Sequence, residues 1–347
     1  MPDIRIRQYA STSAFVGTRD VLLMVFAHSE LPELQKLTQV NRSWANLGRH
    51  VLRERIFLEL GLHILPTTKT SGSSQNMRNQ ALLPFLAMID DTHSVVSGST
   101  ALAVCMHGTD RAGDWMDTRD LDIFTPLARK DVVVNYIVTN LDYKVHESTL
   151  STVFGGPGFP EEHNEFPEGT ASYTQMTRES EIRSVTRLIG ADGQRIDIME
   201  SASDSALLPV TQFPLTHLIN FITGTSLVVC FPWQTLVHRQ SVRNPDAWLD
   251  EGKDLQIRYI QRGWPIVDFD HSAECDNLGH KCPHILRSTE DQHSLAFHFK
   301  LPAGEKSRRT VSYSPETIWL WGYEQLQTYS AVAQTPFIGH GDLMIWC

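Results

Sequence analysis

Three aspartates and a glycine–serine pair are the residues whose types and spacing could do chemistry. Asp120 and Asp122 lie two residues apart at the start of an apolar run, so on a strand they would share one face. Two carboxylates held that close either share a proton or bind a hard cation such as Mg²⁺. Gly98-Ser99 follows the apolar residues 95–96 and precedes a helical pattern, so its turn could bring backbone amides to a phosphate.

A third carboxylate lies in a second predicted strand, residues 194–199. This strand follows the hairpin dipeptide Asp192-Gly193, and its alternation points Asp197 away from the neighbouring isoleucines. A plainer interpretation is also open, because Asp-x-Asp is common at solvated strand edges and Gly-Ser is an ordinary start of a helix. These residues alone are compatible with a metal or phosphate site and with ordinary structural roles.

The ordered set of strand, Gly-Ser turn, helix, Asp-x-Asp and later carboxylate resembles the signature of the polymerase-beta-type nucleotidyltransferase superfamily. The resemblance covers residues 90–200 or so. It implies that Asp120, Asp122 and Asp197 bind Mg²⁺ ions, and that Asp197 also helps to deprotonate an acceptor hydroxyl. The implied reaction is in-line attack on the α-phosphate of an NTP, with two cations as a clamp. Because folds outlive their chemistry, catalysis itself stays open.

The same resemblance implies a triphosphate site around the glycine turn. The amides after Gly98, together with Ser99 and Thr100, would hold the phosphates. Arg187 and Arg183 are spaced to project from one strand face, where they could also meet phosphates. The alternative for both arginines is a solvated position beside acidic neighbours.

The first 65 residues carry a compact helical pattern. Asp20 is a plausible N-cap of a first helix, Leu31-Pro32 starts a second, and residues 47–60 form a third amphipathic stretch. This pattern closely resembles an F-box, although residues 17–19 replace the usual opening Leu-Pro. The positions that match the apolar and Arg-x-Trp pattern are Leu23, Phe26, Leu31, Leu37, Val40, Arg42 and Trp44.

An F-box implies docking on the adaptor Skp1 of a cullin-type ubiquitin ligase, through Leu23, Phe26, Leu31, Leu37 and Trp44. So short a unit buries little apolar surface alone, and we expect it to lean on a partner or on the adjoining domain. The alternative is a plain three-helix cap whose leucines are simply core.

We therefore expect an α+β protein with a three-helix F-box-like module over residues 1–65 and a linker over 66–79. A nucleotidyltransferase-like core with a mixed α/β sheet would follow over 80–205, and a helical and β region over 206–347. Residues 150–180 have the composition of an exposed loop, favouring a surface insertion over a lid. The spacing predicts helices over 80–89, 127–141, 215–222, 254–263 and 319–329, and strands over 143–146, 226–232 and 294–301.

A cluster of cysteines and histidines near the C-terminus raises the question of zinc. Cys275, His280, Cys282 and His284 would make a complete tetrahedral shell. Their spacing is tighter than that of the usual zinc finger, so a histidine-rich surface hairpin is the favoured interpretation.

Composition excludes some classes of function. The net charge of −10 argues against a general nucleic-acid-binding surface, which needs clustered lysine and arginine, although a nucleotide could enter with its metal. We expect no membrane segment, because no apolar run reaches spanning length and the N-terminus is polar. Five cysteines, an odd number spread along the chain, indicate a reduced compartment, either cytoplasm or nucleus.

Three functions remain. The first is an F-box adaptor whose second domain binds a metal–nucleotide without turnover, and the second is an active Mg²⁺-dependent nucleotidyltransferase with an unknown protein, RNA or small-molecule acceptor. The third is an interaction protein with neither role. The whole arrangement, from the F-box-like start to Ile-Asp-Ile-Met-Glu-Ser, resembles a group of uncharacterised fungal proteins.

Overall fold

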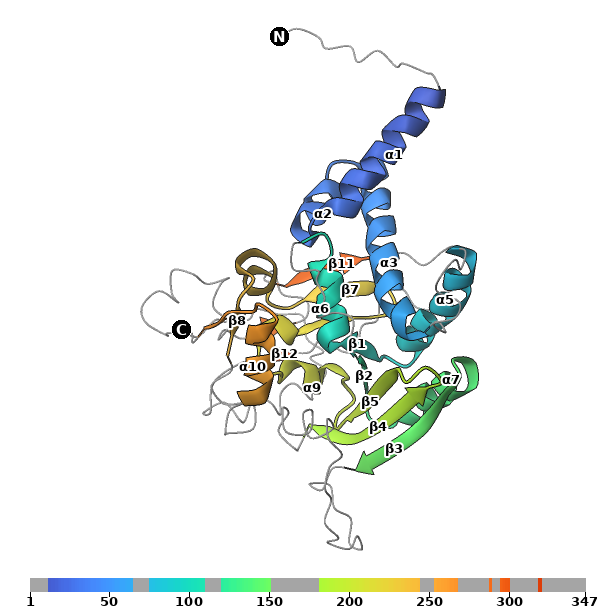
Figure 1. Ribbon diagram of the computed structural model, residues 1–347, viewed down its shortest axis with the longest axis vertical. Helices are drawn as coiled ribbons and strands as arrows, with labels where there is room; N and C mark the ends of the chain where they lie inside the picture. The colour runs from blue at the N-terminus through green and yellow to red at the C-terminus, as the bar shows by residue number, and fades with distance from the viewer. Residues whose placement is uncertain are drawn as a thin grey trace, which may run out of the picture.

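The computed structural model describes residues 12–64, 75–109, 120–150, 181–243, 253–267, 287–288, 294–299 and 318–319. Within these ranges the chain forms a mixed sheet surrounded by helices (Figure 1), which agrees with the expected α+β class. None of the helices in these ranges is long and apolar enough to cross a membrane. Apart from Leu150, which lies in a strand, the loop predicted over 150–180 is outside the described residues, as is the Cys/His cluster of residues 275–284.

The main sheet has eight strands within the described part of the chain, in the order β11-β7-β6-β1-β2-β5-β4-β3. The pair β2·β5 is parallel and the other neighbouring pairs are antiparallel. The strands are β1 (Val95–Ser97), β2 (Leu121–Thr125), β3 (Tyr143–Leu150), β4 (Ile182–Gly190), β5 (Arg195–Ser201), β6 (Asn220–Ile222), β7 (Ser226–Val229) and β11 (Leu295–His298). Two short pairs lie apart from it, β8 (Ser241–Val242) with β9 (Ile266–Val267) and β10 (Arg287–Ser288) with β12 (Ile318–Trp319).

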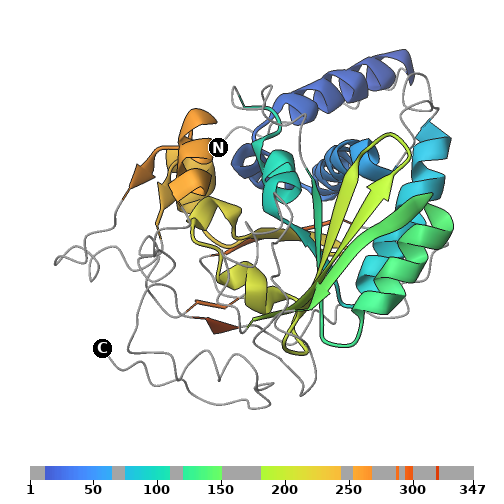
Figure 2. The same cartoon turned by 60° about the horizontal axis from the view of Figure 1, so that its bottom comes forward.

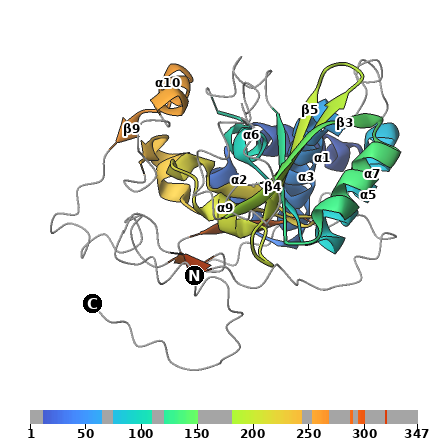
Figure 3. The ribbon, with the colours of Figure 1, turned by 90° about the horizontal axis from the view of Figure 1, so that it is seen from below.

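Helices supply the remaining layers. Figures 2 and 3 show α5 and α7 side by side along the part of the sheet that ends at β3. The α-helices are α1 (Thr12–His28), α2 (Leu31–Thr38), α3 (Arg42–Ile64), α5 (Gln75–Asp91), α6 (Gly98–Met106), α7 (Lys130–Asn140), α9 (Leu207–Thr211) and α10 (Lys253–Gln261). A 3-10 turn, η3 (Thr216–Leu218), and a π-helical turn, η4 (Trp233–His238), complete the described helical elements.

Most local predictions agree with these elements. Helices α2, α3, α7 and α10 and strands β3, β7 and β11 form where the sequence indicates. Helix α1 begins at Thr12, so Asp20 lies inside this helix and is not its N-cap as expected. Helix α5 includes the predicted stretch 80–89, but it begins at Gln75 and so takes in the last residues assigned to the linker. The Asp192-Gly193 turn joins β4 to β5 as expected: Gly193 has φ +82, and the Gly190 amide donates to the Gln194 carbonyl at 2.8 Å.

Two further local predictions are wrong. The helix expected over 215–222 is instead η3 followed by β6. Phe221 and Ile222 are both buried, so this strand is apolar on both faces and carries no alternation to distinguish it from a helix. Trp319, expected in a helix, lies in the short strand β12. The rest of that predicted helix falls outside the described residues.

The N-terminal helices and the sheet share one continuous core. Phe26 of α1 and Ile56 of α3 belong to the same buried cluster as Phe85 of α5 and Leu102 of α6. The helical module therefore leans on the adjoining α/β part, as expected for a unit too small to bury its own apolar surface.

A buried arginine fastens the end of α1 to the end of α6. The Arg55 guanidinium on α3 donates to the carbonyls of Phe26 and Ala27 at 3.2 and 3.1 Å, and also to those of Ser29 and His107. These are carbonyls at helix ends, which lack partners inside their own helix. Burial lowers the pKa of Arg55 to about 10, so the group stays charged at neutral pH.

Two further contacts hold α6 at the same junction. Glu59 of α3 lies 2.9 Å from the His107 ring nitrogen, just after α6. Gly108 has φ +82, and a Cβ there would lie only 3.0 Å from the Ser29 carbonyl oxygen and 3.1 Å from that of His28. The N-terminal helices thus determine where α6 lies.

Arg55→Met should lower the free energy of unfolding by about 2–3 kcal/mol, because it leaves several buried carbonyls without a charged donor while nearly keeping the side-chain volume. Urea unfolding followed by circular dichroism measures this. Arg42→Met, an exposed arginine at the start of the same helix, is the control and should change stability by less than about 0.5 kcal/mol. Equal effects of the two substitutions would contradict the structural role of Arg55.

Candidate functional site

The pairing of three strands aligns the residues that the sequence singled out. In the parallel pair β2·β5, Asp122 is the register partner of Asp197, and in the antiparallel pair β1·β2 it is the partner of Ser97. Register partners project from the same face, and neighbouring strands lie about 4.8 Å apart. Asp120 lies directly before β2. The three carboxylates therefore come to one place, although they derive from two distant segments.

The glycine turn borders this place. Gly98 has φ +67, a conformation that favours glycine, and it starts α6 directly after β1. The Ser97 side chain donates to the Asn220 carbonyl at 2.6 Å rather than capping α6. Ser99 is half-buried. Thr100 is fully buried, and its hydroxyl donates to the Asp120 carbonyl at 3.2 Å, so in this conformation it positions the first carboxylate.

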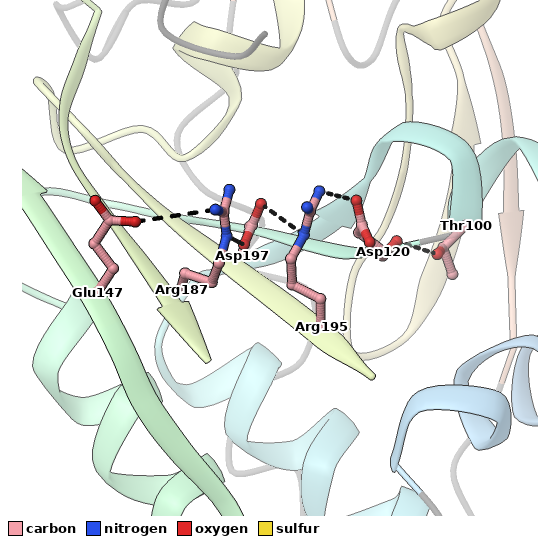
Figure 4. Close-up of polar contacts among 6 residues, drawn as sticks. All are labelled: Thr100, Asp120, Glu147, Arg187, Arg195 and Asp197. Atoms are coloured by element: carbon pink, nitrogen blue, oxygen red, sulfur yellow. Dashed lines mark hydrogen bonds and ion pairs between the residues drawn. The ribbon is translucent and has the colours of Figure 1, made fainter. Parts of the chain in front are cut away.

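Two arginines link the carboxylates into a row of alternating charge (Figure 4). Arg187 Nε lies 3.2 Å from Asp197 Oδ1, and Arg187 Nη1 lies 3.9 Å from Glu147 Oε2. On the other side of Asp197, Arg195 Nε lies 3.4 Å from Oδ2, while its terminal nitrogen pairs with Asp120. The charged row therefore crosses four neighbouring strands: it starts on β3, continues over β4 and β5, and ends at Asp120, directly before β2.

A β-bulge brings Glu147 into this row. The pairing of β3 with β4 shifts between Val145 and Glu147, so that Glu147 comes opposite Arg187 in the register. Bulges are frequent next to functional sites because they re-aim a side chain. Here the bulge gives Arg187 a second carboxylate, and Arg187 is thereby held from both sides.

Burial changes steeply along the row. The side chains of Asp197 and Arg187 are 1% and 6% exposed, whereas those of Arg195 and Asp120 are 24% and 33% exposed. Asp122 is 1% exposed. Glu147, at the other end of the row, is 26% exposed, so the row is partly exposed at both ends and buried in the middle. The end formed by Asp120 and Arg195 borders the start of α6, so a ligand held at the glycine turn would enter from there.

The donor set suits a hard cation, because three carboxylates from one face offer the oxygen ligands that Mg²⁺ prefers. In the conformation described, guanidiniums compete for the same oxygens. Across the described ranges, no group of three or more histidine, cysteine or acidic side chains is already arranged to hold a metal. The carboxylates fit such a role if at least one arginine gives way.

Comparison of the chain with protein-family models, with curated proteins and with solved structures finds no match. Function must therefore be inferred from the site and its surroundings.

The structure thus brings Asp120, Asp122 and Asp197 together, next to Gly98. Arg187 also lies in the site, but its guanidinium pairs with carboxylates and not with solvent, and Arg183 is exposed. Sequence reasoning missed Arg195 and Glu147. The only available signal for Arg195 was its position two residues before Asp197, which places both on one strand face.

The residues predicted to bind a partner differ in exposure. Phe26 and Leu31 are fully buried in the chain's own core, while Leu23, Leu37 and Trp44 are half-buried against it. Phe26 and Trp44 contact each other edge to face, with ring centroids 5.5 Å apart. Between residues 20 and 64, the large apolar side chains that remain exposed are those of Val21, Met24, Val25, Val40, Leu58 and Leu62.

An aromatic cluster lies near Asp122. The buried His217 ring stacks on Trp264, with centroids 4.3 Å apart and an interplanar angle of 9°, and meets Tyr259 edge to face at 4.6 Å. Burial, followed by the charge of Arg262, lowers the pKa of His217 to about 3. Burial is also the largest cause that raises the pKa of Tyr259 to about 12, and the charge of Asp122 adds to it.

His217 should make the fold sensitive to acid. The unfolded chain takes up a proton at His217 below pH 6.5, whereas the folded chain does so only near pH 3, so stability falls as the pH drops through this window. Between pH 7 and pH 5 the loss should be about 2 kcal/mol. Unfolding by urea at both pH values measures it, and His217→Phe should remove that part of the pH dependence. An unchanged dependence in the variant would contradict a neutral, buried His217.

Proposed function

We propose that this protein is an F-box-type adaptor that carries a nucleotidyltransferase-like domain, and that this domain binds a metal–nucleotide complex. The observation that carries the proposal is the parallel register of β2 and β5, which makes Asp122 and Asp197 partners on one face. The resemblance in sequence requires that its three carboxylates meet beside the glycine turn. The pairing of Asp122 with Asp197, with Asp120 directly before β2, supports this proposal.

Each part of the site would have a distinct task. The carboxylates of Asp120, Asp122 and Asp197 would hold the cations, and the amides at the start of α6 would receive the phosphates. When bound, Mg²⁺ would supply charge stabilisation at the reacting phosphate. Asp197, fixed by Arg187, would accept the proton of an acceptor hydroxyl.

Burial of the charged row supports binding of a metal–nucleotide more directly than it supports catalytic turnover. Deeply placed carboxylates require counterions, and in this conformation Arg187 and Arg195 provide them. An active transferase requires that the cations replace part of this pairing. The alternative functions are therefore an active Mg²⁺-dependent nucleotidyltransferase that uses Asp120, Asp122 and Asp197, and an interaction protein without either role.

Binding and turnover can be separated with labelled NTPs. Mg²⁺ with NTP should raise the melting temperature of the wild type, and Asp122→Asn or Asp197→Asn should abolish that rise, because each removes a buried ligand. If the site turns over, transfer of label should fall at least about a hundredfold in both variants. Asp131→Asn, an exposed aspartate on α7, is the control and should behave as wild type.

The outcomes of this experiment are distinct. A nucleotide-induced rise without labelling would identify a binding module, and a rise with labelling an enzyme. No rise and no labelling with any NTP would contradict the proposed nucleotide site.

The adaptor part of the proposal is supported by the exposed side of α1. Val21, Met24 and Val25 are 54%, 58% and 50% exposed on neighbouring turns, although the opposite side of the helix packs Phe26 into the core. Large apolar side chains gathered on one exposed surface are typical of a docking site. The same chain therefore has a face that packs on its own core and a face that a partner such as Skp1 could cover.

Purified Skp1 should form a complex with the protein that depends on this face. Met24→Glu combined with Val25→Glu should weaken the complex at least about tenfold, because it places two charges in an apolar contact. Binding can be measured by titration calorimetry. Val132→Glu, an equally exposed valine on α7, is the control and should leave affinity unchanged. A wild-type protein that does not bind Skp1 would contradict the adaptor proposal.

A further inference from the structure

The end of the charged row that borders α6 contains an arginine that bridges two of the carboxylates. Arg195 pairs with Asp120 and, at 3.4 Å, with Asp197 Oδ2. If a divalent cation is to be held by the same carboxylates, this guanidinium occupies their oxygens. The question is what it does when the site is filled.

We infer that Arg195 is an exchangeable counterion that holds Asp120 and Asp197 while no cation is bound, and moves to the phosphates of the nucleotide when one binds. This rests on the proposed function and assigns to that site a phosphate-binding residue that also keeps it closed to metal alone.

The two arginines differ in the freedom that such an exchange requires. Arg187 is 6% exposed and pairs with Asp197, which is 1% exposed, so its departure would remove a buried counterion from a buried carboxylate. Arg195 is 24% exposed, and one of its partners, Asp120, is 33% exposed. Breaking a partly solvated ion pair costs little free energy, whereas breaking a buried ion pair costs much more. Arg195 is the guanidinium that can leave.

The position of Arg195 also suits the phosphate role. It is the first residue of β5, immediately after the β4–β5 turn, so its backbone lies at an end of the strand. Its partner Asp120 is held through its carbonyl by Thr100, in the first turn of α6. Figure 4 shows Arg195, Asp120 and Thr100 in succession. A guanidinium released from Asp120 is therefore beside the helix start that would receive the phosphates, and its planar fork matches phosphate oxygens.

The balance of charge favours release of Arg195 only when the cation and the polyphosphate bind together. The charged row has three carboxylates, those of Glu147, Asp197 and Asp120, and only two guanidiniums, so it is one positive charge short. A divalent cation alone must displace Arg195 and leave it without an anion. A cation that arrives with a polyphosphate supplies the anion that Arg195 then binds. The site should therefore prefer the complex to the bare metal.

The test measures two affinities in the full-length protein, without any activity assay. Binding of Mn²⁺ alone is followed by electron paramagnetic resonance, and binding of Mg²⁺-tripolyphosphate, which carries the phosphates without base or sugar, by calorimetry. Arg195→Gln should bind Mn²⁺ about three- to tenfold more tightly than wild type and Mg²⁺-tripolyphosphate about tenfold more weakly. Arg183→Gln removes the same charge from an exposed position on β4 and should change neither affinity by more than about twofold.

An increase in the affinity for Mn²⁺ together with a decrease in the affinity for Mg²⁺-tripolyphosphate distinguishes exchange of Arg195 from a merely structural role. If Arg195→Gln weakens both ligands or strengthens both, or equals wild type for both, the inference is wrong even though the proposed site survives. If neither wild type nor variant binds Mn²⁺ or tripolyphosphate, the proposed function fails with it. If Arg195→Gln does not fold, Arg195→Lys carries the test, because lysine keeps the charge but cannot bridge two carboxylates, and the same pair of opposite shifts is expected in smaller size.

Discussion

The parallel pairing of β2 with β5 is the constraint on which the rest of the structure depends. It joins segments that are far apart in the chain, and its register sets Asp122 beside Asp197 on one face and Leu121 beside Ile196 on the other. A shift by one residue would bury the carboxylates of one strand against the apolar side chains of the next. The apolar partners Ile123 and Ile198 continue the same alternation, so the core that fixes the register also fixes the charged row.

The N-terminal helices enter the same arrangement through α6. Arg55 binds carbonyls at the end of α1 and the carbonyl of His107 just after α6, and Gly108 allows the two chain segments to approach closely. Helix α6 starts at the glycine turn of the candidate site and ends at this junction. The position of the glycine turn, which we propose as the phosphate site, therefore depends on the N-terminal helices, which we propose as the docking site for a partner.

Much of the site's framework could be predicted from sequence because its signals are local. Alternation placed Asp120 and Asp122 on a strand, and Asp192-Gly193 indicated the hairpin before Asp197. Arg195 was missed because its partner Asp120 is 75 residues away, and no local pattern predicts which strands pair in parallel. Glu147 was missed because a bulge, which alternation cannot register, brings it opposite Arg187. The strand β6 was mistaken for a helix because it is buried on both faces. In α1 and α2 the spacing identified the apolar positions, but it did not show which of these side chains are buried in the protein's own core.

Stability alone does not account for the charged row. Buried ion pairs recover little more than the cost of removing their charges from water, and apolar side chains of similar volume often serve the fold as well or better. The opposite face of the same strands is filled by such side chains, at Leu121, Ile196 and Ile198, so the sheet could have been apolar here too. Instead Asp122, Asp197 and Arg187 are almost fully buried, and the row becomes partly accessible at its two ends, at Glu147 and at Asp120 with Arg195. Buried charges that packing does not need, with an exposed end beside the start of α6, are what the charged ligand proposed for this site would require.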